Sequence, residues 1–278
     1  MLNDFYIEDH VKKALQEDIG FGDITTDYLT NEDDTLNCEL NSRVEGVLCG
    51  RTVFETVFKI LSPKVNVKFY FNDGDVIHKG DKLASIDGPA RYVLMGERVA
   101  LNYIQRMSGI ASETNKYQQL ISDYKAKIVD TRKTTPLFRA FEKYSVKIGG
   151  GSLHRFNLSD CAMIKDNHIK YAGSLTKAVE KLRNNISHAH KIEVECDTIE
   201  QVKEAVACGA DIIMLDNMSI STMQECVKLI NNRAIVEASG NVNLDTIKEI
   251  AATGVDIISS SAIVAKAPTL DLGLDCKN

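Results

Sequence analysis

The chain has 278 residues, of which 44% are hydrophobic and 26% charged, and its formal net charge is −6. This length predicts one large domain with a smaller one, and the composition is typical of a globular protein with a sizeable core. The negative charge argues against a nucleic-acid partner, so any anion site must be a local cluster of Arg and Lys. No apolar run approaches the ~20 residues that a membrane helix needs, which argues against a membrane partner.

The N-terminus and the cysteines predict a cytoplasmic protein. The first twenty residues are polar, acidic and amphipathic, without the apolar core of a secretory signal. Seven cysteines form an odd set without a Cys-x-x-Cys pair. This pattern favours reduced thiols over a disulfide framework.

Short β-like runs dominate the chain before Gly109. They cover residues 46–50, 65–71 and 82–86, with turns at 72–74 and 79–81 between them. The turn segment 73–81 resembles the hammerhead turn of biotinyl and lipoyl carrier domains, but it lacks a modifiable Lys at a hairpin tip. We therefore interpret it as part of a structural β-domain, followed by a helix over roughly 90–124.

Strands and helices alternate after this helix. The expected strands are 127–129, 161–164, 191–194, 211–215, 234–237 and 255–259, and helical periodicity covers 174–184, 198–208, 221–230 and 244–252. Gly209 and Gly254 are expected to end two of these helices in the left-handed conformation. Repeated strand–helix units indicate a parallel sheet, either open or closed into a barrel.

Polar clusters at the ends of the strands distinguish an open sheet from a barrel. Each strand is followed at once by such a cluster, from Asp130-Thr-Arg-Lys133 to Ser259-Ser-Ser261. An α/β barrel gathers the ends of many strands into one site, whereas an open sheet uses only those at its switch point. Polar clusters after six successive strands therefore favour a TIM-like α/β barrel.

The candidate site residues are the charged and small side chains at these ends. Arg132, Lys133 and Lys165 are cations suited to carboxylates or phosphates, although a solvated pair or an internal ion-pair network would be a plainer explanation. The acids Glu195 and Asp216 occupy the same place on later strands and suit Mg²⁺ or sugar hydroxyls. A glycine-rich turn leads into His154 and Arg155, and loop amides can bind phosphate at Ser239, Gly240, Ser260 and Ser261. His188-Ala-His190 precedes a strand and is interpreted as a surface pair.

Several long motifs resemble the quinolinate phosphoribosyltransferase family over nearly the whole chain. They are EDIGFGDITTD, GERVALNYIQRMSGIAS, DTRKTTP, GGGSLHRFNLSD, IKDNHI, EVECD, IIMLDN, VEASGN and LDLGLD. The resemblance implies an α/β fold with an N-terminal α/β sandwich domain, residues 1–108 joined by 268–278. An incomplete TIM-like barrel, residues 109–267, would be the catalytic domain.

The resemblance also implies an activity and a role for each candidate residue. Quinolinate would be converted with phosphoribosyl pyrophosphate to nicotinate mononucleotide, pyrophosphate and CO₂, in NAD biosynthesis. Quinolinate would be held by Arg132, His154, Arg155 and Lys165, with Arg98 supplied by the second subunit of a homodimer or of a dimer-based hexamer. Phosphoribosyl pyrophosphate would be bound by Lys133, Glu195 and Asp216, and the two acids would also bind Mg²⁺. Lys133, Lys165, Glu195 and Asp216 are thus the expected catalytic residues, and Ser239, Gly240, Ser260 and Ser261 would bind phosphate.

Three departures from the family pattern concern the loops. Leu153 stands where the family has Asn, Asn241 where it has a second Gly, and Ser261-Ala-Ile-Val264 where it has Gly-Ala-Leu-Thr. Two alternatives therefore stay open. One is the molybdenum-transport-associated paralogue, whose pattern lacks Lys165-Asp-Asn-His168. The other is a non-catalytic nucleotide sensor on the same scaffold.

Overall fold

The structure is a computed structural model that describes residues 2–276. The chain forms two compact units. The first comprises residues 1–113, 137–149 and 267–278, and the second residues 114–136 and 150–266. The main difference from the expected boundaries is that 137–149 belongs to the first unit. Within the described residues no helix is both long and apolar enough to cross a bilayer.

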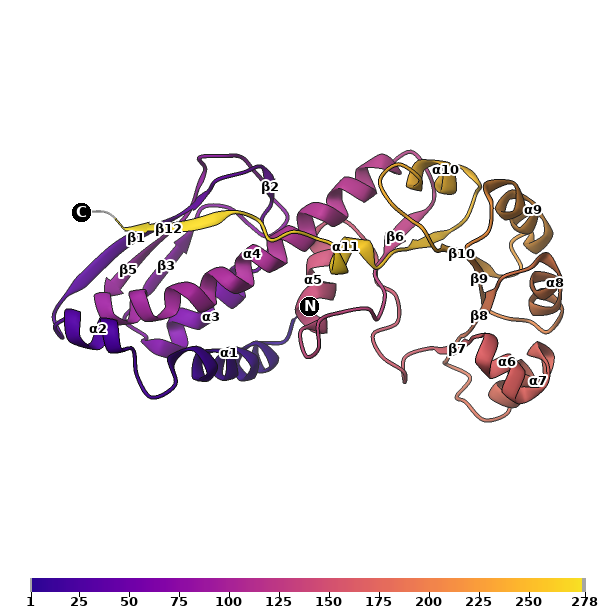
Figure 1. The fold of residues 1–278 in the computed structure, drawn as a ribbon, viewed down its shortest axis with the longest axis horizontal. Helices are drawn as coiled ribbons and strands as arrows, with labels where there is room; N and C mark the ends of the chain where they lie inside the picture. Colours follow the sequence, from indigo (N-terminus) through magenta and orange to yellow (C-terminus); the bar gives the residue numbers. More distant parts are fainter. Residues whose placement is uncertain (1, 277–278) are drawn as a thin grey trace. The chain divides into compact units, whose positions relative to one another are not determined.

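The first unit is built on a four-stranded sheet in the order β12-β1-β5-β3. These strands are β1 Thr35–Ser42, β3 Asn66–Phe69, β5 Lys82–Pro89 and β12 Leu272–Cys276, and all of their pairings are antiparallel. Figure 1 shows the C-terminal β12 lying along β1. A separate two-stranded sheet joins β2 Gly46–Val47 to β4 Val76–Ile77. The turn around Asp73 thus belongs to a structural β-element, as the sequence predicts.

Helices of the first unit bury one apolar face each. They are α1 Asp4–Ile19, α2 Ile24–Leu29, α3 Arg51–Leu61 and α5 Arg139–Ile148. Val53, Phe54, Val57 and Phe58 recur at helical spacing on α3 and are buried in the core. The helix α3 was not predicted from the sequence. The long helix α4, Ala90–Leu120, matches the expected helix closely.

The second unit contains a six-stranded sheet in the order β6-β11-β10-β9-β8-β7, with every pairing parallel. The strands are β6 Lys127–Val129, β7 Ala162–Ile164, β8 Ile192–Cys196, β9 Ile212–Asp216, β10 Ile235–Ser239 and β11 Ile257–Ser259. The sheet curves, and its end strands β6 and β7 do not pair with each other among the described residues. An incomplete barrel is therefore confirmed.

Helices follow the strands of this sheet and cover its outer side (Figure 1). They are α6 Asp166–Ala172, α7 Leu175–Arg183, α8 Ile199–Ala207, α9 Ile220–Ile230, α10 Ile247–Ala252 and α11 Ala262–Ala265. Thr198 and Gln201 form a capping box that starts α8, and Ser219 caps α9. Gly209 and Gly254 have φ of 73° and 90°, which confirms the left-handed ends expected after α8 and α10.

Candidate active site

The strand register brings the polar residues of the sheet into two rows. Residues in register on parallel strands share a face, and side chains alternate between faces along each strand. Glu195, Met214 and Glu237 are in register, and so are Asp216, Ser239 and Ser259. The second row lies two residues further along β9 and β10. The ends of the strands therefore present carboxylates and hydroxyls on one face of the sheet.

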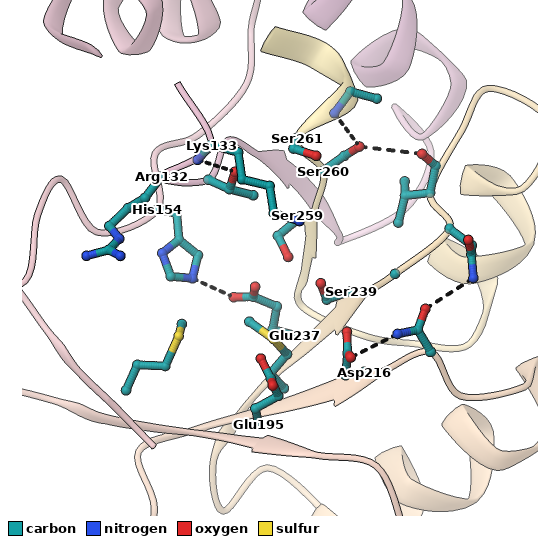
Figure 2. Close-up of a pocket in the computed structure, with 18 of the residues that line it drawn as sticks. Arg132, Lys133, His154, Glu195, Asp216, Glu237, Ser239, Ser259, Ser260 and Ser261 are labelled. Atoms are coloured by element: carbon teal, nitrogen blue, oxygen red, sulfur yellow. Dashed lines mark hydrogen bonds and ion pairs between the residues drawn. The ribbon is translucent and has the colours of Figure 1, made fainter. Parts of the chain in front are cut away.

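These rows line a cavity of about 680 Å³ within the second unit. That size is ordinary for a small-molecule site. Figure 2 shows side chains from several strand ends pointing into it. The lining includes the predicted residues Arg132, Lys133, His154, Arg155, Lys165, Glu195, Asp216, Ser239, Gly240, Ser260 and Ser261.

Arg98 is the predicted site residue that does not line this cavity. It lies on α4 in the first unit and is exposed. The sequence predicts that Arg98 acts in the site of a second subunit. Its role therefore remains a prediction.

Hydrogen bonds and ion pairs hold His154 in the cavity wall. Its backbone N–H donates to Asp130 Oδ1 at 2.9 Å, and its Nδ1 accepts from the Arg155 N–H at 2.8 Å. Its Nε2 lies 3.3 Å from Glu193 Oε2 and 3.4 Å from Glu237 Oε2. In the neutral ring Nδ1 accepts this hydrogen bond, so Nε2 carries the proton and faces the two carboxylates.

Glu193 and Glu237 set the charge of this ring. Both are buried, with exposed fractions of 0% and 1%. Burial opposes the charge on the ring, but hydrogen bonds to the two carboxylates raise the pKa of His154 to about 10. The charged ring carries a proton on Nδ1 as well and cannot accept from the Arg155 amide, but two charged acceptors outweigh the loss of that one neutral hydrogen bond. Burial also raises the pKa of Glu193, against the effect of His154.

A divalent metal at this triad is a second possibility, because His154, Glu193 and Glu237 offer ligand atoms within 4.8 Å of one another. A metal on Nε2 would need a lone pair there, and Nδ1 already uses its own to accept from the Arg155 amide. Neutral imidazole has only one such lone pair. The geometry therefore favours a proton at the triad.

The cations of the site approach its acids from the other strand ends. Lys165 Nζ contacts Glu195 Oε2, which ties the end of β7 to the end of β8. The Arg155 guanidinium donates to the Cys161 carbonyl at 2.9 Å and contacts Met163 Sδ at 3.3 Å. Burial raises the pKa of Asp216, and the negative charge of Glu195 raises it further.

The loops after β10 and β11 supply small residues. Ser260 Oγ accepts from the Ala262 N–H at 3.2 Å, and the Ser260 N–H donates to the Val129 carbonyl at 3.1 Å. Ser239, Ser259, Ser260 and Ser261 lie around one side of the cavity (Figure 2). This side therefore offers hydroxyls, whereas Arg132 and His154 lie on the other side (Figure 2).

Sequence reasoning missed several lining residues, above all Glu237 and its buried partner Glu193. Glu193 precedes Glu195 by two residues, and Glu237 precedes Ser239 by two. Residues two apart on a strand share a face, so this spacing could have identified them. The other cavity residues that it missed are Thr131, Met163, Met214, Asn217, Asn241, Val242, Ser259, Ala262 and Lys266.

Comparisons with known proteins match one family over nearly the whole chain. Residues 23–108 match the N-terminal domain of quinolinate phosphoribosyl transferase, and residues 110–275 match its C-terminal domain. A probable nicotinate-nucleotide pyrophosphorylase [carboxylating] of Bacillus subtilis is 41% identical, over 99% of this chain and 92% of that protein. Its counterpart in Synechocystis is 43% identical, over 96% of this chain and 92% of that protein.

Comparisons with solved structures point to the same family. NadC from Streptococcus pyogenes superposes with a TM-score of 0.96 at 41% identity, covering 100% of this chain and 99% of that one. The nicotinate-nucleotide pyrophosphorylase from Ehrlichia chaffeensis gives 0.94 at 42% identity, covering all of both chains. The chain therefore belongs to the quinolinate phosphoribosyl transferase family.

Proposed function

We propose that this protein transfers the phosphoribosyl group of phosphoribosyl pyrophosphate to quinolinate, with loss of CO₂ and pyrophosphate, to give nicotinate mononucleotide. One observation carries the proposal. A single cavity combines the cations Arg132, Lys133, Arg155 and Lys165 with the acids Glu195 and Asp216. Two polyanionic substrates need such cations, and a ribose needs acceptors for its hydroxyls.

In this reaction the pyridine nitrogen attacks C1 of the ribose while the bond from C1 to pyrophosphate breaks. The ring nitrogen becomes cationic, so the ring can accept the electron pair left at C2 when the 2-carboxylate departs as CO₂. A proton then replaces the carboxylate at C2. Arg132, Arg155 and Lys165 would bind the quinolinate carboxylates, together with protonated His154. Positioning and electrostatics supply the catalysis, and no covalent nucleophile is required.

We propose that Glu195 and Asp216 also bind Mg²⁺. Each carboxylate lies at the end of a strand, and the charge of Glu195 raises the pKa of Asp216. A carboxylate whose ionisation is opposed by a neighbouring negative charge is stabilised by a divalent cation beside it. Mg²⁺ held there would stabilise the charge that develops on the departing pyrophosphate.

We further propose that the protein works as a homodimer or a dimer-based hexamer whose sites are shared. Large apolar side chains in and beside α2 support association, because Phe21, Ile24, Tyr28 and Leu29 have exposed fractions of 75% or more. Contiguous exposed apolar residues of this kind mark association surfaces. Arg98 is exposed and would enter the partner's cavity.

The activity is tested with purified protein, phosphoribosyl pyrophosphate and Mg²⁺. Quinolinate should yield nicotinate mononucleotide, pyrophosphate and CO₂ in equal amounts, whereas nicotinate should not react. Turnover of nicotinate without turnover of quinolinate would overturn the assignment.

The pocket assignment is tested by Arg132→Ala and Lys165→Ala. Each change removes a charge-assisted hydrogen bond to a substrate carboxylate, which is worth roughly 1.5–3 kcal/mol. We expect kcat/KM for quinolinate to fall by about one to two orders of magnitude or more. The control Lys177→Ala removes a cation of the second unit that does not line the cavity. Near-normal rates in both pocket variants would mean that the cations are assigned wrongly.

A further inference from the structure

Two asparagines at the carboxyl ends of β9 and β10 have an unusual backbone. Asn217 and Asn241 have φ of 52° and 53°, in the left-handed region. Asn adopts this conformation at lower cost than most residues other than Gly, but the cost is real. Both residues line the cavity of the candidate active site. Strained residues at a site suggest that their placement has a function.

The side chains of these asparagines form a directed chain of hydrogen bonds that ends on Asp216. Asn241 Nδ2 donates to Asn217 Oδ1 at 3.1 Å, and Asn217 Nδ2 donates to Asp216 Oδ2 at 2.9 Å (Figure 2). A carboxylate accepts and cannot donate, so the Asn217 amide must turn its NH₂ to Asp216. Its oxygen then faces Asn241, which has to supply a donor.

The surrounding backbone leaves little freedom for the Asn217 amide. The Asn217 N–H donates to the Ser239 carbonyl at 2.9 Å, which ties the end of β9 to β10. A Cβ on Gly240 would lie 2.1 Å from Asn217 Oδ1, and Gly240 itself has φ of 93°. The amide therefore occupies space that only a glycine at position 240 leaves open. The Asn241 carbonyl accepts from Thr246 Oγ1 at 3.2 Å, which anchors the last member of the chain.

We propose that Asn241 is a positioning residue that acts through Asn217 to orient the Asp216 carboxylate for phosphoribosyl pyrophosphate. This inference rests on the proposed role of Asp216. Asn241 supplies the donor that the Asn217 oxygen needs, so it acts on the carboxylate through two successive hydrogen bonds.

The first experiment measures binding by calorimetry, separately for phosphoribosyl pyrophosphate with Mg²⁺ and for quinolinate, so that no turnover occurs. Asn241→Gly keeps the left-handed backbone and removes the donor, whereas Asn241→Asp keeps the size and removes the donor. We expect both to weaken phosphoribosyl pyrophosphate binding roughly three- to tenfold, the range for one hydrogen bond. Quinolinate binding should not change in Asn241→Gly, whereas the carboxylate of Asn241→Asp adds a negative charge to the cavity and should weaken both anions.

Asn231→Gly is the matched control, since Asn231 also has a left-handed backbone, with φ of 45°, and ends α9 away from the cavity. It should leave both affinities unchanged. Wild-type affinity of Asn241→Gly for phosphoribosyl pyrophosphate would overturn the proposal. Equal weakening of both ligands by Asn241→Gly, with a lower unfolding midpoint, would also overturn it, because that pattern indicates a structural role.

A double-mutant cycle tests whether Asn241 acts through Asn217. Asn217→Ala removes the link, so adding Asn241→Gly should weaken binding no further. Additive losses would contradict the relay. Failure of the proposed function is distinguishable, because the wild-type protein would then bind neither substrate or would not convert them.

Discussion

The ring of His154 lines the cavity and also belongs to a buried cluster of charged side chains. Glu193 and Glu237 are too deeply buried to be hydrated, and the imidazole is the cation that faces both. Removing one partner of such a cluster leaves a buried charge without compensation. The cluster therefore keeps His154 cationic toward an anionic substrate at neutral pH.

This charge predicts a dependence of stability on pH. The pKa of His154 is raised from its ordinary value of 6.5 to about 10 in the folded protein. Its contribution to stability is therefore complete below about pH 6.5 and is lost progressively as the pH rises toward 10. We expect the difference in urea midpoint between wild type and His154→Gln to shrink over this range. A difference that stays constant from pH 6 to 10 would contradict the raised pKa.

Among whole elements, α4 and the segment before β12 pack so closely that a glycine is required. A Cβ on Gly109 would lie 1.9 Å from the carbonyl oxygen of Pro268. Alanine is otherwise the better helix former, by about 1 kcal/mol. Here the close approach of a backbone carbonyl reverses that preference.

Gly109→Ala should therefore destabilise the protein by roughly 1–3 kcal/mol, the usual cost of overpacking, in spite of the gain in helix propensity. Urea unfolding followed by circular dichroism measures the change. Asn102→Ala, at an exposed position of the same helix, is the control and should stay within about 0.5 kcal/mol of wild type. If Gly109→Ala were stabilising, the packing described for α4 would be wrong.

Helices and strands whose apolar residues recur at a regular spacing could be predicted from the sequence, whereas contacts between loops could not. The barrel strands and α4 carry apolar patterns that match their geometry, so Lys165, Glu195 and Asp216 could be placed at strand ends. The helix α3 was missed although its apolar residues have helical spacing. The contact of Asn217 with Asn241 depends on how two loops approach each other, and no local pattern encodes that approach.

For the whole molecule, the proposed sharing of Arg98 between subunits makes a prediction that a monomeric enzyme would not meet. Arg98→Ala and Arg132→Ala should each be strongly impaired alone. In a mixed dimer, one cavity has both an intact Arg132 and an intact partner Arg98. Mixing equal amounts under conditions of subunit exchange should restore about a quarter of wild-type activity, because half of the dimers are mixed and each has one intact site.

The control is a mixture of Arg132→Ala with Lys165→Ala. Both residues belong to the same subunit's cavity, so every site in every dimer stays defective. No activity should return. Recovery in neither mixture would place Arg98 in the site of its own subunit or make the protein a monomer.

The position of β12 has a consequence for biosynthesis. β1 is the first strand made and pairs on one side with the last strand, Leu272–Cys276. During translation this side of β1 stays an open edge, able to pair with other chains, until Leu272–Cys276 have left the ribosome. The second unit ends at residue 266, so all of its residues are made before β12. The unit that begins the chain is thus completed after the second unit, and a chain cut short before Leu272 would leave its sheet with an unprotected edge.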